Sequence, residues 1–182
     1  PGFFRAEDDE GILSCRLVGL IGECFGETSY TALARMVLRR CPEEVQRRYP
    51  LSLLRLCYAL YGGCEFAEFA RQMTRIRELL ADSGAHYLGE WELLDALAFF
   101  PDLDGMDAAY ARAEKLLTHD SELFIPEEPF FFGCTSMWYL FYAEPGQMMT
   151  TADRLAQVLK RYDRLTNGHA AGAEELYRGE AY

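Results

Sequence analysis

Apolar residues recur at every third or fourth position in four segments of this chain, which is the spacing of one face of an α-helix. These amphipathic segments are Tyr30–Cys41, Phe66–Leu80, Met106–Leu117 and Leu155–Leu165. Each follows a segment that is apolar almost all the way round, and these are Ile12–Phe25, Leu51–Tyr61, Leu88–Phe100 and Ser136–Ala143. A helix that is apolar on every side must be covered by several neighbours. The pattern therefore predicts an all-α fold, an α-solenoid in which antiparallel helical hairpins stack on one another.

Prolines and glycines mark the ends of the expected helices. Pro50 suits the first position of a helix that Gly62 and Gly63 close, and Pro101 ends the helix that precedes it. We expect hairpins at about residues 7–41, 50–82, 86–118 and 134–166, and a final helix at 170–180. Equivalent positions lie 36, 40 and 46 residues apart, near the period of tetratricopeptide-like repeats. Residues 1–182 are therefore expected to form one helical-repeat domain.

The run His119–Gly133 interrupts this rhythm. It contains Pro126 and Pro129, which argue against a helix, and several phenylalanines. We expect an extended, aromatic-rich loop that lies over the stack of helices. Long loops inside compact domains are often functional, although large aromatic side chains in such a loop also serve simply to fill a gap.

The net charge of the chain limits the kinds of molecule that it is expected to bind. A net charge of −11 repels phosphate backbones, so this segment is not expected to bind DNA or RNA directly. No run of about 18 uncharged apolar residues occurs, so no membrane span is expected. The arginines form local clusters, for which solvated helix faces are the favoured interpretation. The clustered residues are Arg39, Arg40, Arg47, Arg48, Arg71, Arg75 and Arg77.

The cysteines indicate a reducing environment. None of the six belongs to a C-x-x-C pair, so the spacing of a zinc site is absent. Several lie within apolar stripes, where a free cysteine behaves as a small apolar residue. A cytoplasmic protein is therefore expected. Because the chain begins with Pro1 and shows no signal peptide, we expect a fragment of a longer protein.

Motifs of catalysis and cofactor binding are missing from the sequence. There is no phosphate loop, no G-x-G-x-x-G, no H-E-x-x-H and no G-x-S-x-G, so we expect neither an enzyme nor a cofactor in this segment. His86 and Glu90 lie one helical turn apart, and Glu92 and Asp95 follow. A metal site needs three or four ligands at suitable spacing, so no metal is expected there.

Aromatic side chains are the main candidates for a ligand groove, although aromatic residues at helical spacing belong more often to the core. His169 lies near a helix end, where a capping role is the commoner one. The candidate effector or partner contacts are Trp91, Trp138, Tyr139, Tyr142 and His169. No catalytic, cofactor-binding or metal-binding residue is assigned.

Four runs of sequence carry a family resemblance. They are Tyr49–Leu60 (YPLSLLRLCYAL), Leu88–Leu94 (LGEWELL), Ser136–Phe141 (SMWYLF) and Leu165–Glu175 (LTNGHAAGAEE). Together they resemble the central helical-repeat region of large LuxR-type, MalT-like transcriptional regulators of bacteria. The resemblance extends from about Tyr49 to the end of the chain, and it rests on sequence habits rather than on catalytic signatures.

The resemblance implies a sensing function. In that family a nucleotide-binding ATPase module precedes the helical array, and a helix-turn-helix that binds DNA follows it. It thus implies a domain that receives a small-molecule effector or a regulatory protein, with ATP bound only by the upstream module and DNA only by the downstream one. The alternative is a stand-alone helical-repeat adaptor that binds another protein.

Overall fold

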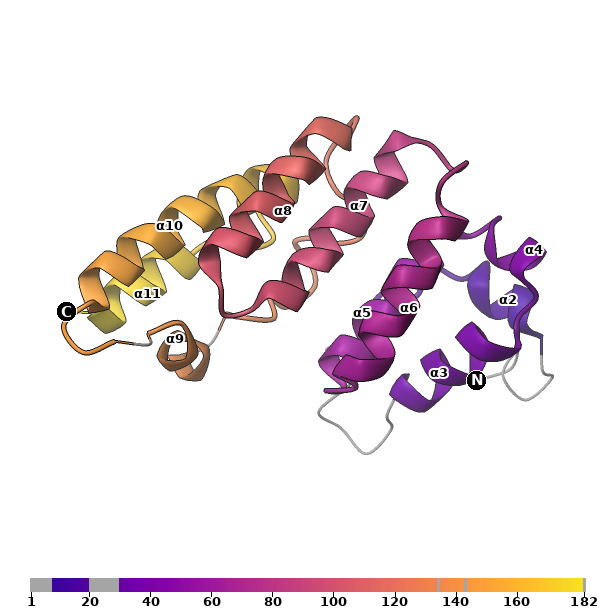
Figure 1. Ribbon diagram of the computed structural model, residues 1–182, viewed down its shortest axis with the longest axis horizontal. Coiled ribbons are helices and arrows are strands. Elements are labelled where there is room, and N and C mark those ends of the chain that lie inside the picture. The colour runs from indigo at the N-terminus through magenta and orange to yellow at the C-terminus, as the bar shows by residue number, and fades with distance from the viewer. Residues whose placement is uncertain (1–7, 20–29, 134, 143, 182) are drawn as a thin grey trace.

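The computed structural model describes residues 8–19, 30–133, 135–142 and 144–181, and every regular element in these ranges is helical (Figure 1). The elements are α2 (Asp9–Leu13), α3 (Tyr30–Arg40), α4 (Glu43–Gln46), α5 (Pro50–Gly62), α6 (Phe66–Leu79), α7 (Ala85–Asp95), the 3₁₀ helix η1 (Ala96–Phe99), α8 (Leu103–Leu116), α9 (Thr135–Phe141), α10 (Met148–Leu165) and α11 (Ala173–Ala181). The predicted all-α class is confirmed. Within these ranges, no helix combines the length and the apolar composition needed to cross a membrane.

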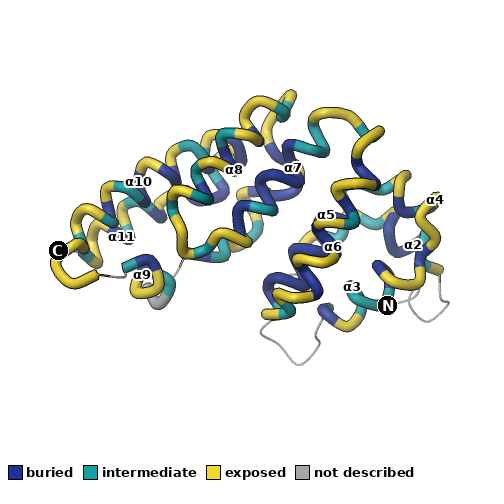
Figure 2. Tube along the Cα trace, in the orientation of Figure 1, coloured by how far each residue is buried: buried dark blue, intermediate teal, exposed yellow. Residues whose placement is uncertain are grey.

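Helix α5 is buried on all sides, as its composition predicts (Figure 2). Pro50 stands in its first turn, and Gly63 follows its last turn as the C-cap. Helices α3, α6 and α7 all pack against α5, and a short turn joins it to α6. Each of its residues from Ser52 to Gly62 is buried. A helix with one apolar face exposes its other face to water. Helix α5 is covered on all sides, which matches the apolar residues all round it.

Helices α7 and α8 pack side by side along their length (Figure 1). Their close approach depends on Gly89, because a Cβ atom there would lie 2.8 Å from Cγ and 2.9 Å from the backbone N of Leu117. Between them the chain tightens into η1, and α8 then begins at Leu103 after its N-cap Asp102, whose carboxylate accepts a hydrogen bond from the Asp104 backbone N at 3.1 Å. The cap thus fixes where α8 starts, and the glycine permits the close contact of the two helices.

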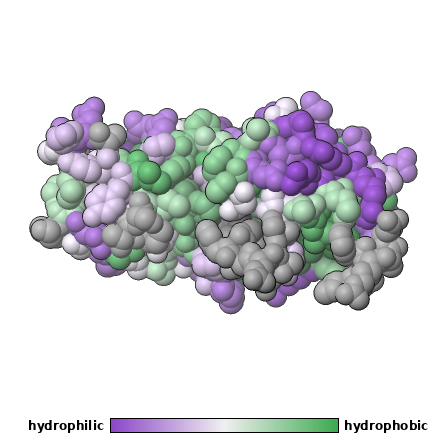
Figure 3. Space-filling view, turned by 90° about the horizontal axis from the view of Figure 1, so that it is seen from below, coloured by the Kyte–Doolittle hydropathy of each residue, from purple (hydrophilic) through white to green (hydrophobic). Residues whose placement is uncertain are grey.

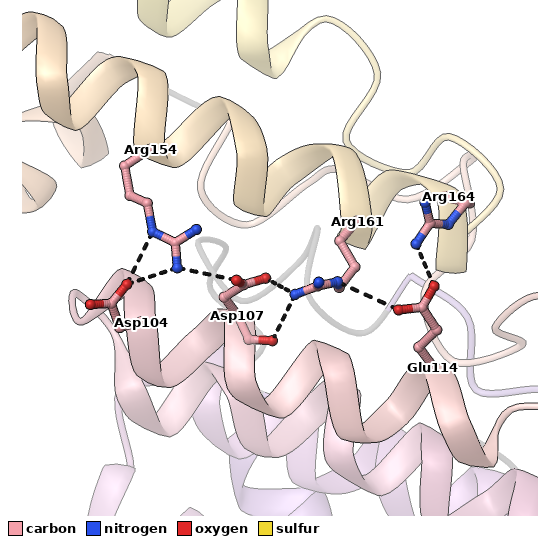
Figure 4. Close-up of polar contacts among 6 residues, drawn as sticks. All are labelled: Asp104, Asp107, Glu114, Arg154, Arg161 and Arg164. Carbon is pink, nitrogen blue, oxygen red and sulfur yellow. Dashed lines mark hydrogen bonds and ion pairs between the residues drawn. The ribbon is translucent and has the colours of Figure 1, made fainter.

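Charged side chains join α8 to α10 in a ladder of ion pairs (Figure 4). The acidic members on α8 are Asp104, Asp107 and Glu114, and the basic members on α10 are Arg154, Arg161 and Arg164. Asp107 lies between two arginines, with Arg154 Nη2 at 3.1 Å and Arg161 bound directly to its carboxylate. Arg154 also reaches Asp104 at 2.7 Å, and these hydrogen bonds to Asp104 and Asp107 raise its pKa. The ladder fixes how α10 lies on α8.

The first expected helix is shorter than predicted. Helix α2 ends at Leu13 instead of continuing to Phe25, and Leu17 and Gly19 have positive φ angles of 45° and 79°. Residues 20–29, which include the rest of the predicted helix, lie outside the described ranges. Side chains of α5 bind the carbonyl groups that a longer helix would use: Ser52 Oγ donates to the Leu13 carbonyl at 2.6 Å, and Arg55 donates to the Arg16 carbonyl at 2.6 Å. Tertiary hydrogen bonds thus replace the helical ones.

The clustered arginines connect helices, which the interpretation as solvated faces did not anticipate. Arg40 pairs with Asp9 at 2.5 Å and joins α3 to α2. Arg75 reaches from α6 to the Leu38 carbonyl at 3.0 Å. Arg39 of α3 pairs with Glu68, and Arg47 after α4 donates to the Leu79 carbonyl. All of the clustered arginines except Arg75 are nevertheless exposed, so the predicted exposure is confirmed for six of the seven.

Replacing Asp107 with asparagine should destabilise the fold. Asp107 is 21% exposed and holds two arginines, so its loss should lower the free energy of unfolding by about 1 kcal/mol, as measured by urea denaturation at low ionic strength. Salt at about 1 M should shrink the effect, because it screens partly exposed charges. Asp104→Asn is the matched control: this carboxylate is 86% exposed and should matter much less. Equal effects of the two changes would contradict this account of the ladder.

Candidate functional site

The loop of residues 117–133, called here the connecting loop, is held by a fully buried carboxylate on α7. Glu90 accepts hydrogen bonds from Ser121 Oγ at 2.6 Å, from the Glu122 backbone N at 2.5 Å and from the Leu123 backbone N at 3.3 Å. Burial raises the pKa of Glu90, while these donors act in the opposite direction. A buried charge is tolerated only when it is well hydrogen-bonded, and here the loop supplies the donors.

A buried arginine holds the same segment from the other side. Arg55 on α5 donates through Nη2 to the Glu122 carbonyl and through Nη1 to the Arg16 carbonyl, both at 2.6 Å. Burial lowers its pKa, and the carboxylates of Glu128, Glu90 and Glu122 act against that shift. Glu122 therefore offers its N–H to a carboxylate and its carbonyl to a guanidinium. This pair of opposite charges fastens the loop to both α5 and α7.

Aromatic residues of the connecting loop are part of the core. Phe124 packs edge-on against Tyr58 of α5 with ring centroids 5.0 Å apart, and Phe132 stacks on Phe100 at 4.8 Å. Phe130 lies 5.5 Å from the ring of Tyr162 on α10. Leu123, Phe124 and Phe132 are essentially fully buried. The predicted non-helical, aromatic-rich loop is confirmed, but it is not extended, because its backbone turns at residues 126–127 and 131–132. It does not lie over the stack of helices as expected but fills space between them, rather than covering a site as a lid.

His169 belongs to this aromatic core. Its Nδ1 is hydrogen-bonded to the Tyr162 hydroxyl at 2.6 Å, and its ring lies 5.6 Å from Phe124 and 5.8 Å from Phe130. Burial lowers its pKa to about 4, against the effect of the Pro129 and Glu128 carbonyl groups. His169 is therefore neutral at pH 7 and is not placed to contact an effector from solvent.

The aromatic candidates on α9 divide between core and surface. Trp138 is fully buried and packs on Tyr142 and Tyr177 with centroid distances of 6.4 and 5.8 Å. The Tyr142 hydroxyl accepts a hydrogen bond from the Gly146 backbone N at 3.1 Å. Tyr139 is 61% exposed. Trp138 is thus a core residue in this structure, and its ring is not exposed to a ligand.

Trp91 lies beside an open groove between α6 and α7. Its Nε1 donates to the Met73 carbonyl at 2.9 Å, and the Arg77 guanidinium lies over its ring at 5.4 Å. The groove has a volume of about 520 Å³. We call it the α6–α7 groove; it is lined on the α6 side by Phe69, Ala70, Met73, Thr74, Arg77, Glu78 and Ala81, and on the α7–η1 side by Trp91, Asp95 and Ala98.

The five candidate contacts do not form one site. His169 and Trp138 are core residues, Tyr139 is on the surface, and Trp91 lies on the far side of α7 at the α6–α7 groove. Sequence reasoning also missed Arg55 and Glu90 as the residues that hold the loop. A signal was present for Arg55, a charged residue in a helix that is otherwise apolar, because such residues are rarely buried without partners. Glu90 offered no such signal, since Glu92 and Asp95 also lie on α7.

Glu90 and Glu92, two of the side chains weighed as metal ligands, are bound to other partners. His86 Nε2 is 3.5 Å from Glu90 Oε1, but that carboxylate is committed to the loop. Glu92 pairs with Arg112 at 2.8 Å. In the part of the chain that the structure describes, no three His, Cys, Asp or Glu side chains are grouped so that they could hold a metal ion.

Comparisons of the chain with protein-family models, with curated proteins and with solved structures find no significant match.

Removing the Glu90 carboxylate should loosen the loop and the fold together. Glu90→Ala removes the acceptor of the Ser121 hydroxyl and of the Glu122 N–H, while the Leu123 N–H keeps Ser121 Oγ at 3.1 Å, so the free energy of unfolding should fall by about 3 kcal/mol. Glu90→Gln keeps one acceptor oxygen and should cost about 1 kcal/mol. Chemical denaturation measures both changes, with the exposed Glu78→Ala as the control. A Glu90→Ala protein as stable as the control would contradict this role.

Acid should destabilise the protein through His169. The unfolded chain takes up a proton near pH 6.5, but the folded chain does so only near pH 4, so stability falls as the pH drops between these values. The loss due to this group should reach about 3 kcal/mol. His169→Asn should flatten the dependence, measured by denaturation across this range, and the exposed His119→Asn should retain it. An unchanged profile for His169→Asn would contradict the assignment.

Proposed function

We propose that this chain is a tetratricopeptide-like helical-repeat domain that binds an effector or partner protein and couples that binding to the DNA-binding activity of a LuxR-type transcriptional regulator. The proposal is supported by the four stretches of sequence that resemble members of that family. The observation that carries it is the α6–α7 groove, an open surface between two neighbouring helical hairpins. Binding sites are commonly concave surfaces of this size that combine apolar walls with a few polar groups.

The position of the groove supports a coupling function. It lies between the α5–α6 hairpin and the α7–α8 hairpin, and α8 is tied to α10 by the ion-pair ladder. A ligand in the groove contacts both hairpins and so favours one arrangement of the two over another. Such a ligand shifts an equilibrium only if its affinity differs between the two states. The C-terminal helices would carry the shift toward a DNA-binding module.

The remaining parts of the proposal concern partners and location. With a net charge of −11, this domain would contact DNA only through a downstream helix-turn-helix, and ATP would be bound only by an upstream module. Its free thiols at Cys41 and Cys57 are buried, which suits a reducing cytoplasm. The α6–α7 groove equally supports the alternative function, a stand-alone adaptor that binds another protein.

The sequence on either side of this chain tests the family proposal. We expect a phosphate-loop motif upstream and a helix-turn-helix downstream in the same reading frame. In that full-length protein, deletion of residues 30–181 should leave DNA binding intact but abolish the change in promoter output that an inducing condition produces. A start codon directly before Pro1 and a stop codon directly after Tyr182 would contradict the regulator and favour the adaptor.

A further inference from the structure

We propose that the α6–α7 groove is a docking site for a basic amphipathic helix of a partner polypeptide. The inference deepens the proposed partner-binding function and rests on it. Three features of the groove point to this occupant: its length and small-residue walls, its exposed apolar end, and acidic side chains that make no ion pair among the described residues.

The walls of the groove leave room for a helix. On α6 the row Ala70, Thr74 and Glu78 repeats every four residues, and Ala98 on η1 faces it across the groove. A second cavity of about 360 Å³ continues past Phe66, sharing Phe69, Ala70 and Ala98 with the first. From Phe66 to Ala81 the groove follows α6 for about 22 Å at 1.5 Å per residue. That length suits a partner helix of about 15 residues better than a small molecule.

One end of the groove is apolar and exposed. Phe66 at the start of α6 is 52% exposed, and it lines the second cavity together with Phe69, Leu97 and Phe100. Viewed from below, green apolar surface gathers in the middle of the molecule, next to a strongly hydrophilic region (Figure 3). Leucine or phenylalanine side chains of a partner helix would bury these rings.

The other end of the groove holds two carboxylates, and positive charges act on one of them: burial raises the pKa of Asp95, while Arg112 and Arg77 lower it. Among the described residues, the carboxylates of Glu78 and Asp95 make no hydrogen bond or ion pair, and Arg77 lies over the Trp91 ring instead. Asp95 is half-buried, so a basic side chain reaching it would be only partly screened by water. A lysine or arginine on the partner would form an ion pair with these carboxylates.

The charge of the whole chain favours this occupant over others. At −11, the chain repels a second copy of itself, nucleic acid and an anionic membrane surface, whereas it attracts a basic segment. The contact between α8 and α10 shows how such carboxylates are paired within this chain, because there the arginines of α10 bind the carboxylates of α8 (Figure 4). At the α6–α7 groove the lining holds Glu78, Asp95 and the arginine Arg77, whose guanidinium lies over the Trp91 ring and, among the described residues, makes no ion pair.

Binding of designed peptides to the intact chain tests the proposal. The probe is a fluorescein-labelled peptide of about 15 residues, with leucines on one helical face and lysine and arginine beside them. The control peptide replaces each basic residue with glutamate. We expect saturable binding of the basic peptide by fluorescence anisotropy, and affinity at least about tenfold weaker for the acidic one. In a Trp138→Phe background Trp91 is the sole tryptophan, and its emission should change on binding.

Groove variants locate the bound peptide. Ala70→Trp should fill the groove and reduce affinity by about tenfold or more, whereas Ala67→Trp, on the same helix but outside the groove lining, should not. Asp95→Asn should weaken the basic peptide several-fold, and Glu44→Gln on α4 should leave its affinity unchanged. Circular dichroism of each variant verifies that the helices remain folded.

Four results would overturn the proposal. They are no saturable binding, equal binding of both peptides, equal affinity of the Ala70→Trp and Ala67→Trp proteins, or a dimer in sedimentation that Ala70→Trp alone dissolves, which would make a second copy the occupant. These outcomes are independent of the regulator proposal. If the flanking modules are found and the peptides do not bind, the docking site fails and the regulator stands; binding without those modules leaves the docking site and removes the regulator.

Discussion

The hydrogen bonds between the buried carboxylate of Glu90 and the backbone of the connecting loop are the contacts on which the arrangement of this molecule depends. Glu90 and Arg55 are buried charged residues, and each would be costly to bury alone. The loop offsets both burial penalties, because the Glu122 N–H donates to the Glu90 carboxylate and the Glu122 carbonyl accepts from the Arg55 guanidinium. With the loop fixed there, Phe124 and Phe132 enter the core, and His169 and Tyr162 pack around them.

This anchoring determines where binding can occur. The space between α5, α7 and α10 is filled by the loop's own aromatic side chains. An open surface lies between α6 and α7, at the α6–α7 groove. The connecting loop fills the first of these spaces from within the chain. Among the described residues no segment fills the α6–α7 groove in the same way, and this is why we propose that a partner polypeptide does.

The fold was largely predictable and the site was not, for physical reasons. Helical periodicity and the positions of Pro50, Gly63 and Pro101 reflect local rules, and the helices from 50 to 116 follow them closely. The stretch after Leu13 departs from its apolar pattern because Ser52 and Arg55, distant in sequence, bind its carbonyl groups. Likewise, sequence alone identified Trp91 and Trp138 as similar candidates, but only tertiary packing buries Trp138 completely and leaves Trp91 beside a groove.

The central claim is that the connecting loop is an integral part of the core and not a lid. Native-state hydrogen exchange of the Glu122, Leu123 and Phe124 amides tests it most directly, since these donors bind Glu90 and Ser121. Our account predicts that they exchange only when the whole protein unfolds, with the same free energy as the amides of α5 and the same dependence on denaturant. Exchange through a local opening, at a free energy several kcal/mol lower and independent of denaturant, would show that the loop detaches from a folded array and would contradict the account.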